Sequence, residues 1–360
     1  MIKPVIIIGG GLAGLYSAYQ LQLLNTPYLL LEAKSQLGGR IYSAQSPVNS
    51  GVSFDLGPTW IFPHQPKIQA LIKSLNLSLF EQYTKGDVLY QSPHSEQPQQ
   101  IAGAGEMQLF RLKHGMNTLI TALYEQLNPD FVLLNHNVTE LKKSGDSWQI
   151  TVNHLGNIKH FNTNKLMSAI PARMVTAHLT PEQWATPTLI SRLNSVPTWM
   201  AGQAKFIATF EHAFWRDNNL SGQCFSRVGP MVEIHDASAE DDNYAALFGF
   251  IGVPYLSRSE VTKEQLIQAC VQQLSYFYGQ DAKKATGYFI KDWAEDELVA
   301  NEDDRTQSSQ HPEFNFSGLG EQLSNLNIHF VASEFAKQEA GYLEGAINAV
   351  DEAINSIISL

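Results

Sequence analysis

The chain opens with apolar runs of strand length separated by a segment with helical character. The run Val5–Ile8 is wholly apolar, and an apolar, helix-compatible segment follows from Leu12 to Leu24. A second apolar run, Tyr28–Leu31, ends at the acidic residue Glu32. Short continuous apolar runs bounded by turn residues are typical of buried strands. The pattern therefore predicts a strand-helix-strand unit at the start of the chain.

The rest of the chain continues to mix helical and strand periodicities. Helices are predicted over Pro66–Leu75, Asn117–Leu127, Thr262–Tyr278, with Thr262 as N-cap, and Gly341–Ile358. Strands are predicted over Phe131–Leu134, Val138–Lys142, Gln149–Val152, Lys159–Phe161, Leu166–Ile170, Gln203–Phe210, Met231–His235, Ala245–Ile251 and Thr286–Trp293. The strands between 138 and 161 form a meander in this interpretation, and those between 203 and 251 belong to an antiparallel sheet. No element is predicted in Gly86–Gly105, which is short and rich in Gln, Pro, Ser and Gly.

Three glycines follow the first strand at a spacing that suits a dinucleotide. Gly9, Gly11 and Gly14 have G-x-G-x-x-G spacing and open the first predicted helix. Gly9 permits the turn, Gly11 permits close approach of a pyrophosphate, and Gly14 permits tight helix–strand packing. Glu32, at the end of the second strand, is placed to accept ribose hydroxyls. The alternative is an ordinary glycine-rich turn.

A second glycine pair favours FAD over NAD. Gly38-Gly39-Arg40 comes shortly after Glu32, and an arginine fork there suits a phosphate. This segment resembles the Glu…Gly-Gly-Arg motif of the flavin-containing amine oxidase superfamily, although a plain Gly-Gly turn with a surface arginine would also fit. Phe54–Trp60 resembles the family segment beside the flavin ring, and Asp55 fits a loop cap equally well.

The end of the chain carries the other family-like pair. Phe330–Glu334 resembles a strand that ends in small and acidic residues, and Gly341–Ala346 starts a helix whose amides would face the flavin pyrimidine. Val138 matches the position that touches adenine, although plain sheet core is an alternative. The resemblance implies the following cofactor-binding residues: Gly9, Gly11, Leu12, Ala13, Gly14, Glu32, Ala33, Gly39, Arg40, Gly57, Pro58, Thr59, Trp60, Val138, Ser333, Glu334, Leu343 and Ala346.

Three residues are candidates for catalysis. Lys205 lies among apolar residues in a predicted strand and resembles the family lysine that holds a water at flavin N5; a snorkelling surface lysine is the alternative. Trp293 resembles the tryptophan that packs near the flavin, or is a plain core residue. Tyr342 corresponds to one aromatic of the family's amine cage.

The chain departs from the family at the residue that anchors FAD covalently in mammalian monoamine oxidases. Counting from Trp293, that cysteine position holds Glu302, and the neighbouring cage aromatic is replaced by Asp303. The loop Glu302–Asp304 is expected to be solvated surface, since clustered charges seldom bury. The two cysteines, Cys224 and Cys270, lie elsewhere, and an apolar setting keeps Cys270 inert. FAD is therefore expected to be bound non-covalently.

Composition narrows the function classes. The 360 residues are 44% hydrophobic and carry a net charge of −11, which suits a large core and disfavours nucleic acid as a partner. The two cysteines lack metal spacing, so no metal site is predicted. They are interpreted as buried thiols in a reducing compartment, with a single disulfide as the alternative. With no signal peptide and no long apolar run, we expect a soluble cytoplasmic protein without a membrane partner.

The resemblance implies an α/β fold, with a discontinuous Rossmann-type FAD-binding domain and an inserted substrate domain of antiparallel sheet plus helix. The FAD domain is predicted at 1–80, 108–193 and 294–360, and the substrate domain at 81–107 and 194–293, with a small lid. The implied reaction transfers a hydride from an amine to flavin N5, and O2 reoxidises the flavin to give imine and H2O2. Alternatives are a desaturase or dehydrogenase acting on a non-amine, and a flavin-binding protein without turnover. The oligomeric state is left open.

Overall fold

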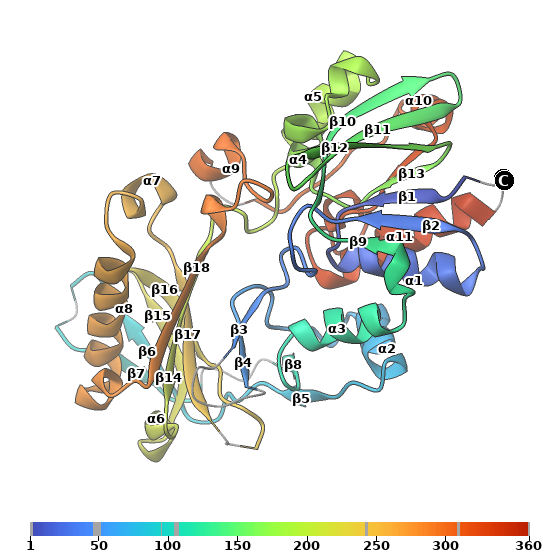
Figure 1. The fold of residues 1–360 in the computed structure, drawn as a ribbon. Coiled ribbons are helices and arrows are strands. Elements are labelled where there is room, and N and C mark those ends of the chain that lie inside the picture. The colour runs from blue at the N-terminus through green and yellow to red at the C-terminus, as the bar shows by residue number, and fades with distance from the viewer. Residues whose placement is uncertain are drawn as a thin grey trace.

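The computed structural model describes residues 3–45, 52–94, 96–103, 108–241, 244–307 and 310–358. The chain forms two lobes, each built on its own sheet (Figure 1). One lobe contains a parallel sheet covered on both faces, and the other contains an antiparallel sheet backed by a long helix.

The first lobe is built on a five-stranded, all-parallel sheet in the order β19-β13-β1-β2-β9. Its strands are β1 (Val5–Ile8), β2 (Tyr28–Leu31), β9 (Val132–Leu133), β13 (Leu166–Ser168) and β19 (Ile328–Phe330). The central position of β1, with β2 beside it after a helical crossover, is the arrangement of a Rossmann-type domain. All four residues of β1 are buried, as its continuous apolar run predicts.

Different elements cover the two faces of this sheet. Val5 and Ile7 pack with the helices α1 (Leu12–Leu23), α2 (Pro66–Ser74), α3 (Asn117–Glu125) and α11 (Leu343–Ile358). Ile6 and Ile8 pack into a second core with the meander β10 (His136–Ser144), β11 (Ser147–His154) and β12 (Asn157–Thr163). The helices α4 (Ala172–His178), α5 (Pro187–Ser195) and α10 (Gly320–Leu326) complete this face. Because successive side chains of a strand point to opposite faces, one short strand anchors both cores.

The second lobe is built on a seven-stranded sheet in the order β18-β14-β17-β16-β15-β6-β7. Its strands are β6 (Asp87–Gln91), β7 (Gln99–Ile101), β14 (Ala204–Phe210), β15 (Leu220–Ser226), β16 (Met231–Asp236), β17 (Ala245–Ile251) and β18 (Gly287–Asp292). Neighbours are antiparallel except β15 and β6, which run parallel. All seven lie within the ranges 81–107 and 194–293 given above for the substrate domain, whose exact boundaries stay a prediction.

One face of the larger sheet is covered by the helix α8 (Lys263–Tyr278). Thr262 is its N-cap and forms a capping box with Gln265, as the sequence predicts. Phe206 and Ala208 of β14 pack toward α8, whereas Ile207 belongs to a separate cluster on the opposite face. By strand alternation Lys205 lies on the same face as Ile207, the face turned away from α8.

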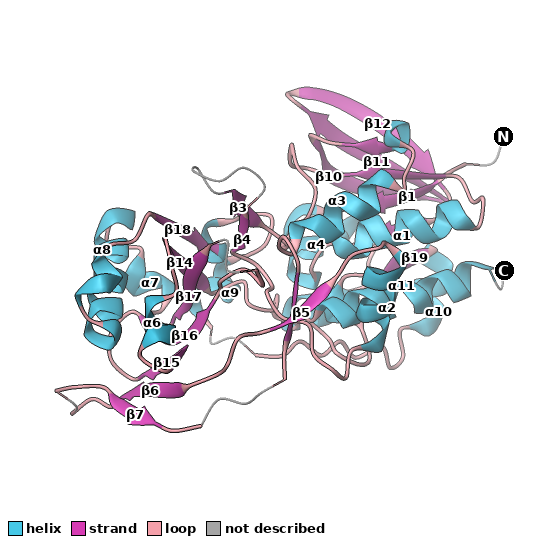
Figure 2. Cartoon of the chain, turned by 90° about the horizontal axis from the view of Figure 1, so that it is seen from below, coloured by secondary structure: helices cyan, strands magenta, loops and turns pink. Residues whose placement is uncertain are grey.

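Short elements connect the lobes (Figure 2). Two antiparallel strand pairs lie in the connections between the lobes. One pairs β3 (Ser43–Gln45) with β4 (Ser53–Asp55), and the other pairs β5 (Leu79–Glu81) with β8 (Phe110–Leu112). The remaining short helices are α6 (Phe214–Asp217), α7 (Tyr255–Arg258) and α9 (Glu302–Thr306), with 3-10 turns at Pro129–Phe131, Pro181–Gln183, Gln280–Lys283, Trp293–Glu295 and Ser333–Phe335. No helix in the described ranges is both long and apolar enough to span a membrane.

The structure corrects several sequence expectations. The strands β6 and β7, for which the sequence gives no specific prediction, lie within Gly86–Gly105 and extend the large sheet. The segment Phe330–Glu334 is not a strand: β19 ends at Phe330, and a 3-10 turn begins at Ser333. The last helix starts at Leu343 rather than Gly341, which has φ of +86°. Residues 302–304 form the start of helix α9 instead of a loop.

Candidate functional site

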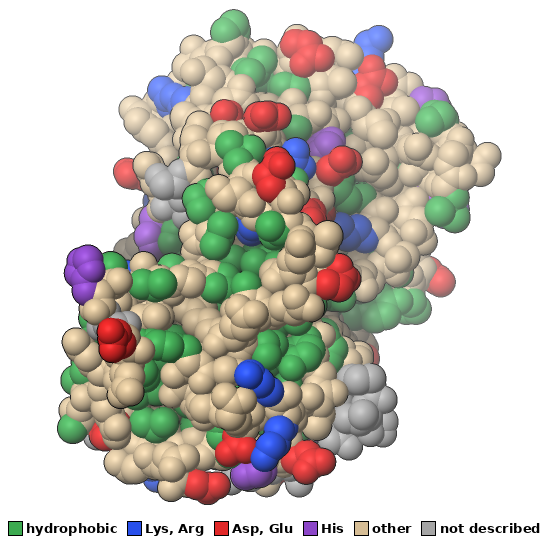
Figure 3. Space-filling view, turned by 90° about the vertical axis from the view of Figure 1, so that its left-hand side faces the viewer, with side chains coloured by type: hydrophobic (Ala, Val, Ile, Leu, Met, Phe, Trp, Pro, Cys, Tyr) green, Lys and Arg blue, Asp and Glu red, His purple; other side chains and the backbone are tan. Residues whose placement is uncertain are grey.

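A cavity of about 440 Å³ lies between the lobes and takes its wall from both. It begins at the glycine turn after β1 and continues to β14 and β17 of the large sheet. On the face seen in Figure 3, hydrophobic side chains surround the indentation between the lobes, with a few charged ones among them. The wall is therefore assembled from segments far apart in the sequence.

The glycine turn is shaped by close backbone approach. A Cβ atom at Gly14 would lie 1.8 Å from the carbonyl oxygen of Gly9, so α1 can pack on β1 only with glycine there. Gly9 has φ of +101°, in the region that favours glycine. Gly11 is the N-cap of α1 and provides no side-chain cap, and a Cβ there would lie 3.7 Å from Gly38 O, an ordinary van der Waals contact. The first amides of α1 thus remain available to an anion.

Glu32 is held at the end of β2 by backbone amides. Its Oε2 accepts a hydrogen bond from Gly10 N at 2.5 Å, and its Oε1 accepts one from Lys34 N at 2.8 Å. Burial raises the pKa of the Glu32 carboxyl, while these two hydrogen bonds act in the opposite direction. The carboxylate lines the cavity in a fixed orientation, with lone pairs left for a hydroxyl donor.

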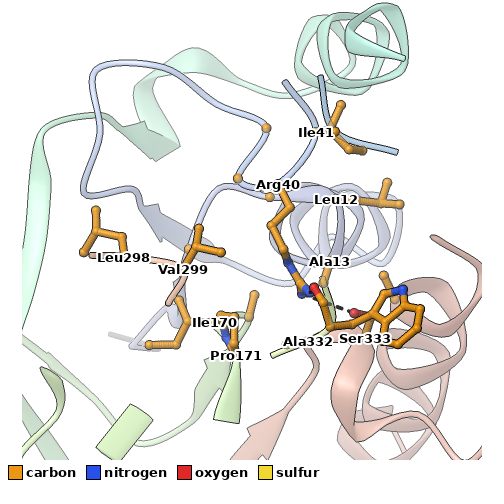
Figure 4. Close-up of a pocket in the computed structure, with 18 of the residues that line it drawn as sticks. Leu12, Ala13, Arg40, Ile41, Ile170, Pro171, Leu298, Val299, Ala332 and Ser333 are labelled. Atoms are coloured by element: carbon orange, nitrogen blue, oxygen red, sulfur yellow. Dashed lines mark hydrogen bonds between the residues drawn. The ribbon is translucent and has the colours of Figure 1, made fainter. Parts of the chain in front are cut away.

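The Arg40 guanidinium forms a bidentate ion pair with a carboxylate. Its guanidinium pairs with both carboxylate oxygens of Glu334, at 2.5 and 3.0 Å, and Nη2 donates to Ser333 Oγ at 3.2 Å. Figure 4 shows Arg40 reaching across to Ser333, while Leu298 and Val299 approach from another segment. Glu334 is fully buried and does not line the cavity, so it holds the arginine in place from behind.

Lys205 is a buried cation at the other end of the cavity. It is 3% exposed; its Nζ donates to Thr59 Oγ1 and, at 3.2 Å, to Gly57 O, and lies 4.1 Å from the centre of the Phe248 ring. Burial lowers the pKa of Lys205 to about 7, with Asp55 opposing the shift and Arg111 adding to it. Lys205 is therefore not a snorkelling surface residue.

Asp55 is buried next to this region and caps a loop. Its Oδ1 accepts from Ser43 Oγ at 2.6 Å and from Met116 N at 2.8 Å. Burial raises the pKa of Asp55. The loop-capping interpretation of Asp55 is thus confirmed, and the side chain does not line the cavity.

Aromatic rings line several stretches of the cavity wall. Trp293 is buried, and its Nε1 donates to Leu56 O at 2.9 Å. Tyr342 is half-buried, with the Phe62 ring edge-on at 5.7 Å and the Trp199 ring at 6.1 Å. His311 stacks on Trp199 at 3.8 Å, and the Tyr342 hydroxyl lies 3.4 Å from His311 Nε2.

The cavity brings together most of the residues proposed from the sequence. Every candidate cofactor-binding or catalytic residue lines it except Gly14, which packs against Gly9, and Glu334, which holds Arg40. Sequence reasoning missed these lining residues: Phe62, Gln65, His136, Met174, His178, Trp199, Met200, Phe250, Leu298 and Val299. Most lie in loops without periodicity, so only the tertiary fold could reveal them.

The expectation of solvated surface for Glu302–Asp304 is confirmed at the first two residues and is wrong at the third. Glu302 and Asp303 are exposed and do not line the cavity, whereas Asp304 is buried. Asp304 Oδ1 accepts from Arg173 Nη1 at 2.6 Å, and its backbone and side chain form a capping box with Asn301. The Asp304 carboxylate can be buried because it forms an ion pair with Arg173 and accepts a hydrogen bond from a backbone amide at the helix start.

Comparison with known proteins assigns this arrangement to a family. The sequence pattern of the family described as flavin containing amine oxidoreductase matches residues 12–99 and 97–353. The chain is 23% identical to amine oxidase [flavin-containing] A of Equus caballus over 465 aligned positions, covering 99% of this chain and 85% of the relative.

Two solved structures share the fold over nearly the whole chain. One is wild-type putrescine oxidase bound to putrescine, with TM-score 0.79, 18% identity and 99% coverage of both chains. The other is cyclohexylamine oxidase from Brevibacterium oxydans IH-35A, with TM-score 0.82, 16% identity and coverage of 100% of this chain and 99% of that one. The predicted fold class, a Rossmann-type domain with an inserted antiparallel-sheet domain, is thereby confirmed.

Proposed function

Because this chain belongs to the flavin containing amine oxidoreductase family, we propose that it binds FAD and oxidises amines with O2 as the electron acceptor. The family makes it a flavin-dependent oxidoreductase; the identity of the flavin, its non-covalent binding and the details of the reaction are our proposal. The main observation in support of the proposal is one continuous cavity, which is lined by the glycine turn, Glu32, Lys205 and Tyr342.

The residues present fit FAD. The N-terminus of α1, whose N-cap Gly11 has no side chain, suits a pyrophosphate, and Glu32 suits ribose hydroxyls. Val138 and Ala33 would border the adenine, while Gly57–Trp60 and Trp293 would border the flavin ring. Leu343 and Ala346, at the start of α11, would place that helix N-terminus next to the cofactor.

FAD would supply the redox chemistry, taking a hydride from the C–H beside the amine nitrogen and passing two electrons to O2, to give imine and H2O2. The protein's own residues position and desolvate the amine. Tyr342 and Trp293 offer apolar walls that favour the neutral amine. Lys205, with its pKa near neutrality, can hold a water and exchange a proton close to physiological pH.

The proposal also includes an amine as the partner and a cytoplasmic location. Putrescine oxidase, a structural neighbour, has been solved with an amine bound, which supports an amine as the partner here. Cys224 and Cys270 are both free and buried, in line with a reducing, cytoplasmic compartment.

Spectroscopy of the purified protein tests the function directly. We expect an oxidised flavin spectrum, anaerobic bleaching by a primary amine, and H2O2 on readmission of air. Flavin that only a chemical reductant such as dithionite bleaches would point to a non-amine substrate or to a protein without turnover. A colourless protein that FAD does not stabilise against heat would contradict the FAD assignment.

Lys205→Met separates the role of Lys205 from a structural one. We expect the variant to retain FAD and the fold, while reoxidation of the reduced flavin by O2, or steady-state turnover, slows markedly. Lys291→Met is the matched control, because Lys291 pairs with Lys205 on the neighbouring strand but does not line the cavity. Unchanged rates in both half-reactions would remove Lys205 from the mechanism.

A further inference from the structure

We infer that the stacked rings of His136 and His154 support the adenosine end of the cofactor, and that protonation of His136 withdraws this support, so that the protein loses FAD in acid. The inference rests on the proposed FAD binding and concerns how that binding is regulated. It comes from a cluster of basic side chains on the strands β10, β11 and β12, at the Glu32 end of the cavity.

His136 lies next to the acid proposed to bind the ribose. Its backbone N donates to the backbone O of Glu32 at 2.8 Å, and its side chain is 5% exposed and lines the cavity. Val138, two residues further along β10, lines the cavity as well, because side chains two apart on a strand share a face. The imidazole therefore borders the cavity between the positions proposed for the ribose and for the adenine.

His154, on the neighbouring strand β11, supports the His136 ring from behind. The two residues are directly opposite each other in the antiparallel pair, and their rings stack with centres 4.2 Å apart and planes 28° from parallel. His154 Nδ1 lies 3.1 Å from Asn135 O and is the donor, because a carbonyl only accepts. His154 itself does not line the cavity. A ring fixed in this way offers a flat apolar surface of the kind on which nucleotide bases stack.

The hydrogen bonds of His136 require a neutral ring. Nδ1 lies 2.7 Å from Leu134 O, which can only accept, so Nδ1 carries a hydrogen. Nε2 lies 3.2 Å from Lys159 Nζ, whose ammonium can only donate, so Nε2 keeps its lone pair. A proton on Nε2 would abolish this second hydrogen bond and place two positive charges against each other. Burial lowers the pKa of His136 below its ordinary 6.5, and His154 and Lys159 add to the shift while the Leu134 hydrogen bond opposes it.

Cofactor binding and protonation of His136 therefore oppose each other. A nucleotide lying over the ring removes it further from water, which disfavours the charged imidazolium more than the open cavity does. The negative charge of the cofactor is on its pyrophosphate, which is expected at the glycine turn, and the adenosine itself is uncharged. Above pH 6.5 the ring is neutral and FAD is held, whereas below this value the proton competes with the cofactor and the affinity falls.

The other charged groups at this end of the cavity have partners of their own. The Lys34 ammonium pairs with Asp296 at 2.5 Å, and His178 Nε2, on α4, lies 3.1 Å from the backbone O of Glu297. Glu32 is the one acid among the described lining residues, and burial raises the pKa of its carboxyl. Protonation of Glu32 would weaken FAD binding over part of the same pH range, so the experiment has to separate it from His136.

Retention of FAD by the purified holoenzyme tests the inference without measuring activity. The holoenzyme is transferred to buffers between pH 7.5 and pH 5.0 at constant ionic strength, and free flavin is separated by ultrafiltration at several protein concentrations. This gives an apparent dissociation constant for FAD at each pH. We expect the constant to rise at least about fivefold below pH 6.5, while the far-UV circular dichroism stays unchanged.

Lys159→Gln tests the charge next to His136. Lys159 is exposed and does not line the cavity, and a glutamine amide can still donate to His136 Nε2 without carrying a charge. Removing the ammonium makes His136 easier to protonate, so the midpoint of FAD loss should move to higher pH by about 0.3 units or more. Lys142→Gln, at an exposed position of β10, is the matched control and should leave the midpoint in place. A purely structural role of the histidine pair would not move it.

His136→Phe keeps a ring against His154 but has no proton to bind. FAD retention by this variant should be flat between pH 7.5 and pH 5.0. Acid loss of FAD that persists in His136→Phe would assign the effect to Glu32 and overturn the inference, as would an unmoved midpoint in Lys159→Gln or a flat profile in the parent. Lys159→Gln decides alone where His136→Phe does not fold. A protein that holds no flavin at any pH would instead be a failure of the proposed function.

Discussion

At the scale of single residues, the site depends on groups whose burial changes their protonation. Lys205 is the clearest case, because its pKa falls from 10.5 to about 7 when the chain folds. The unfolded chain keeps this proton up to about pH 10, whereas the folded chain releases it near pH 7. Between about pH 7 and pH 10 the chain therefore binds a proton when it unfolds, and the free energy of unfolding rises with pH across this range.

The resulting prediction concerns the slope of stability against pH. Between pH 7.5 and 9.5, Lys205 should contribute up to about 1.4 kcal/mol of unfolding free energy per pH unit, and Lys205→Met should remove this contribution. Urea unfolding at constant FAD concentration measures it. Lys73→Met, at an exposed position of α2, is the control and should leave the slope as it is. An identical slope in Lys205→Met would mean that Lys205 stays charged in the fold.

Glu32 gives a second prediction at this scale, which concerns cofactor affinity. Glu32→Ala removes the proposed ribose acceptor and frees the amides of Gly10 and Lys34, so FAD binding should weaken by about 1–3 kcal/mol. Titration of flavin-free protein with FAD, followed by flavin fluorescence, gives the dissociation constant. Glu81→Ala, at an exposed acid, should bind as the parent does. Equal affinities for both variants would exclude Glu32 from the nucleotide site.

At the scale of elements, the short helix α9 depends on one buried carboxylate. Asp304 pairs with Arg173, accepts from Thr198 N at 3.1 Å, and completes the capping box with Asn301. Asp304→Ala should lower the free energy of unfolding by about 3–5 kcal/mol, because it leaves Arg173 buried without its partner. Thermal or urea unfolding measures the loss. Asp303→Ala, one residue earlier and exposed, should cost under about 0.5 kcal/mol; similar losses in both would place the stabilising charge elsewhere.

The same helix illustrates where sequence reasoning succeeds and where it stops. Periodicity located β1, α1 and β2 because continuous apolar runs and a glycine turn encode them locally. Local charge density suggested a solvated loop at 302–304, yet the burial of Asp304 depends on Arg173 about 130 residues away. Similarly, β7 has one apolar residue of its own and becomes a strand by pairing with β6 at the edge of a sheet begun elsewhere.

The residues of the candidate site also fall into two groups, those that the sequence indicates and those that only the fold brings together. The glycines and Glu32 could be proposed from spacing, because their chemistry requires fixed residue types in a fixed order. Arg40 needed the family resemblance as well. Trp199 and Phe62 could not, since each lies in a loop and meets Tyr342 only through the tertiary fold. Glu302, the position reached by counting from Trp293, is exposed and does not line the cavity, whereas Leu298 and Val299 of the preceding turn do.

At the scale of the whole molecule, the large sheet separates the cysteines from the cavity. Cys224 in β15 and Cys270 in α8 both belong to the core on the α8 side of the large sheet, opposite the face that carries Lys205. Cys224 Sγ lies 3.0 Å from the Tyr278 hydroxyl, and burial raises the pKa of both thiols, that of Cys270 to about 12. A thiol held neutral in a packed core is inert as a nucleophile.

The attachment of the flavin follows from this arrangement. A thioether to the cofactor needs a thiolate on the cavity wall, and the described lining contains no cysteine; its histidines, His136 and His178, lie beside Glu32 or on α4. We expect FAD held by hydrogen bonds and burial alone, so acid denaturation and filtration should leave all the yellow colour in the filtrate. The intact polypeptide should show the mass of the bare chain, and Cys224→Ser should behave identically. Flavin retained on the precipitated chain would require an attachment residue on the wall that burial and spacing do not reveal.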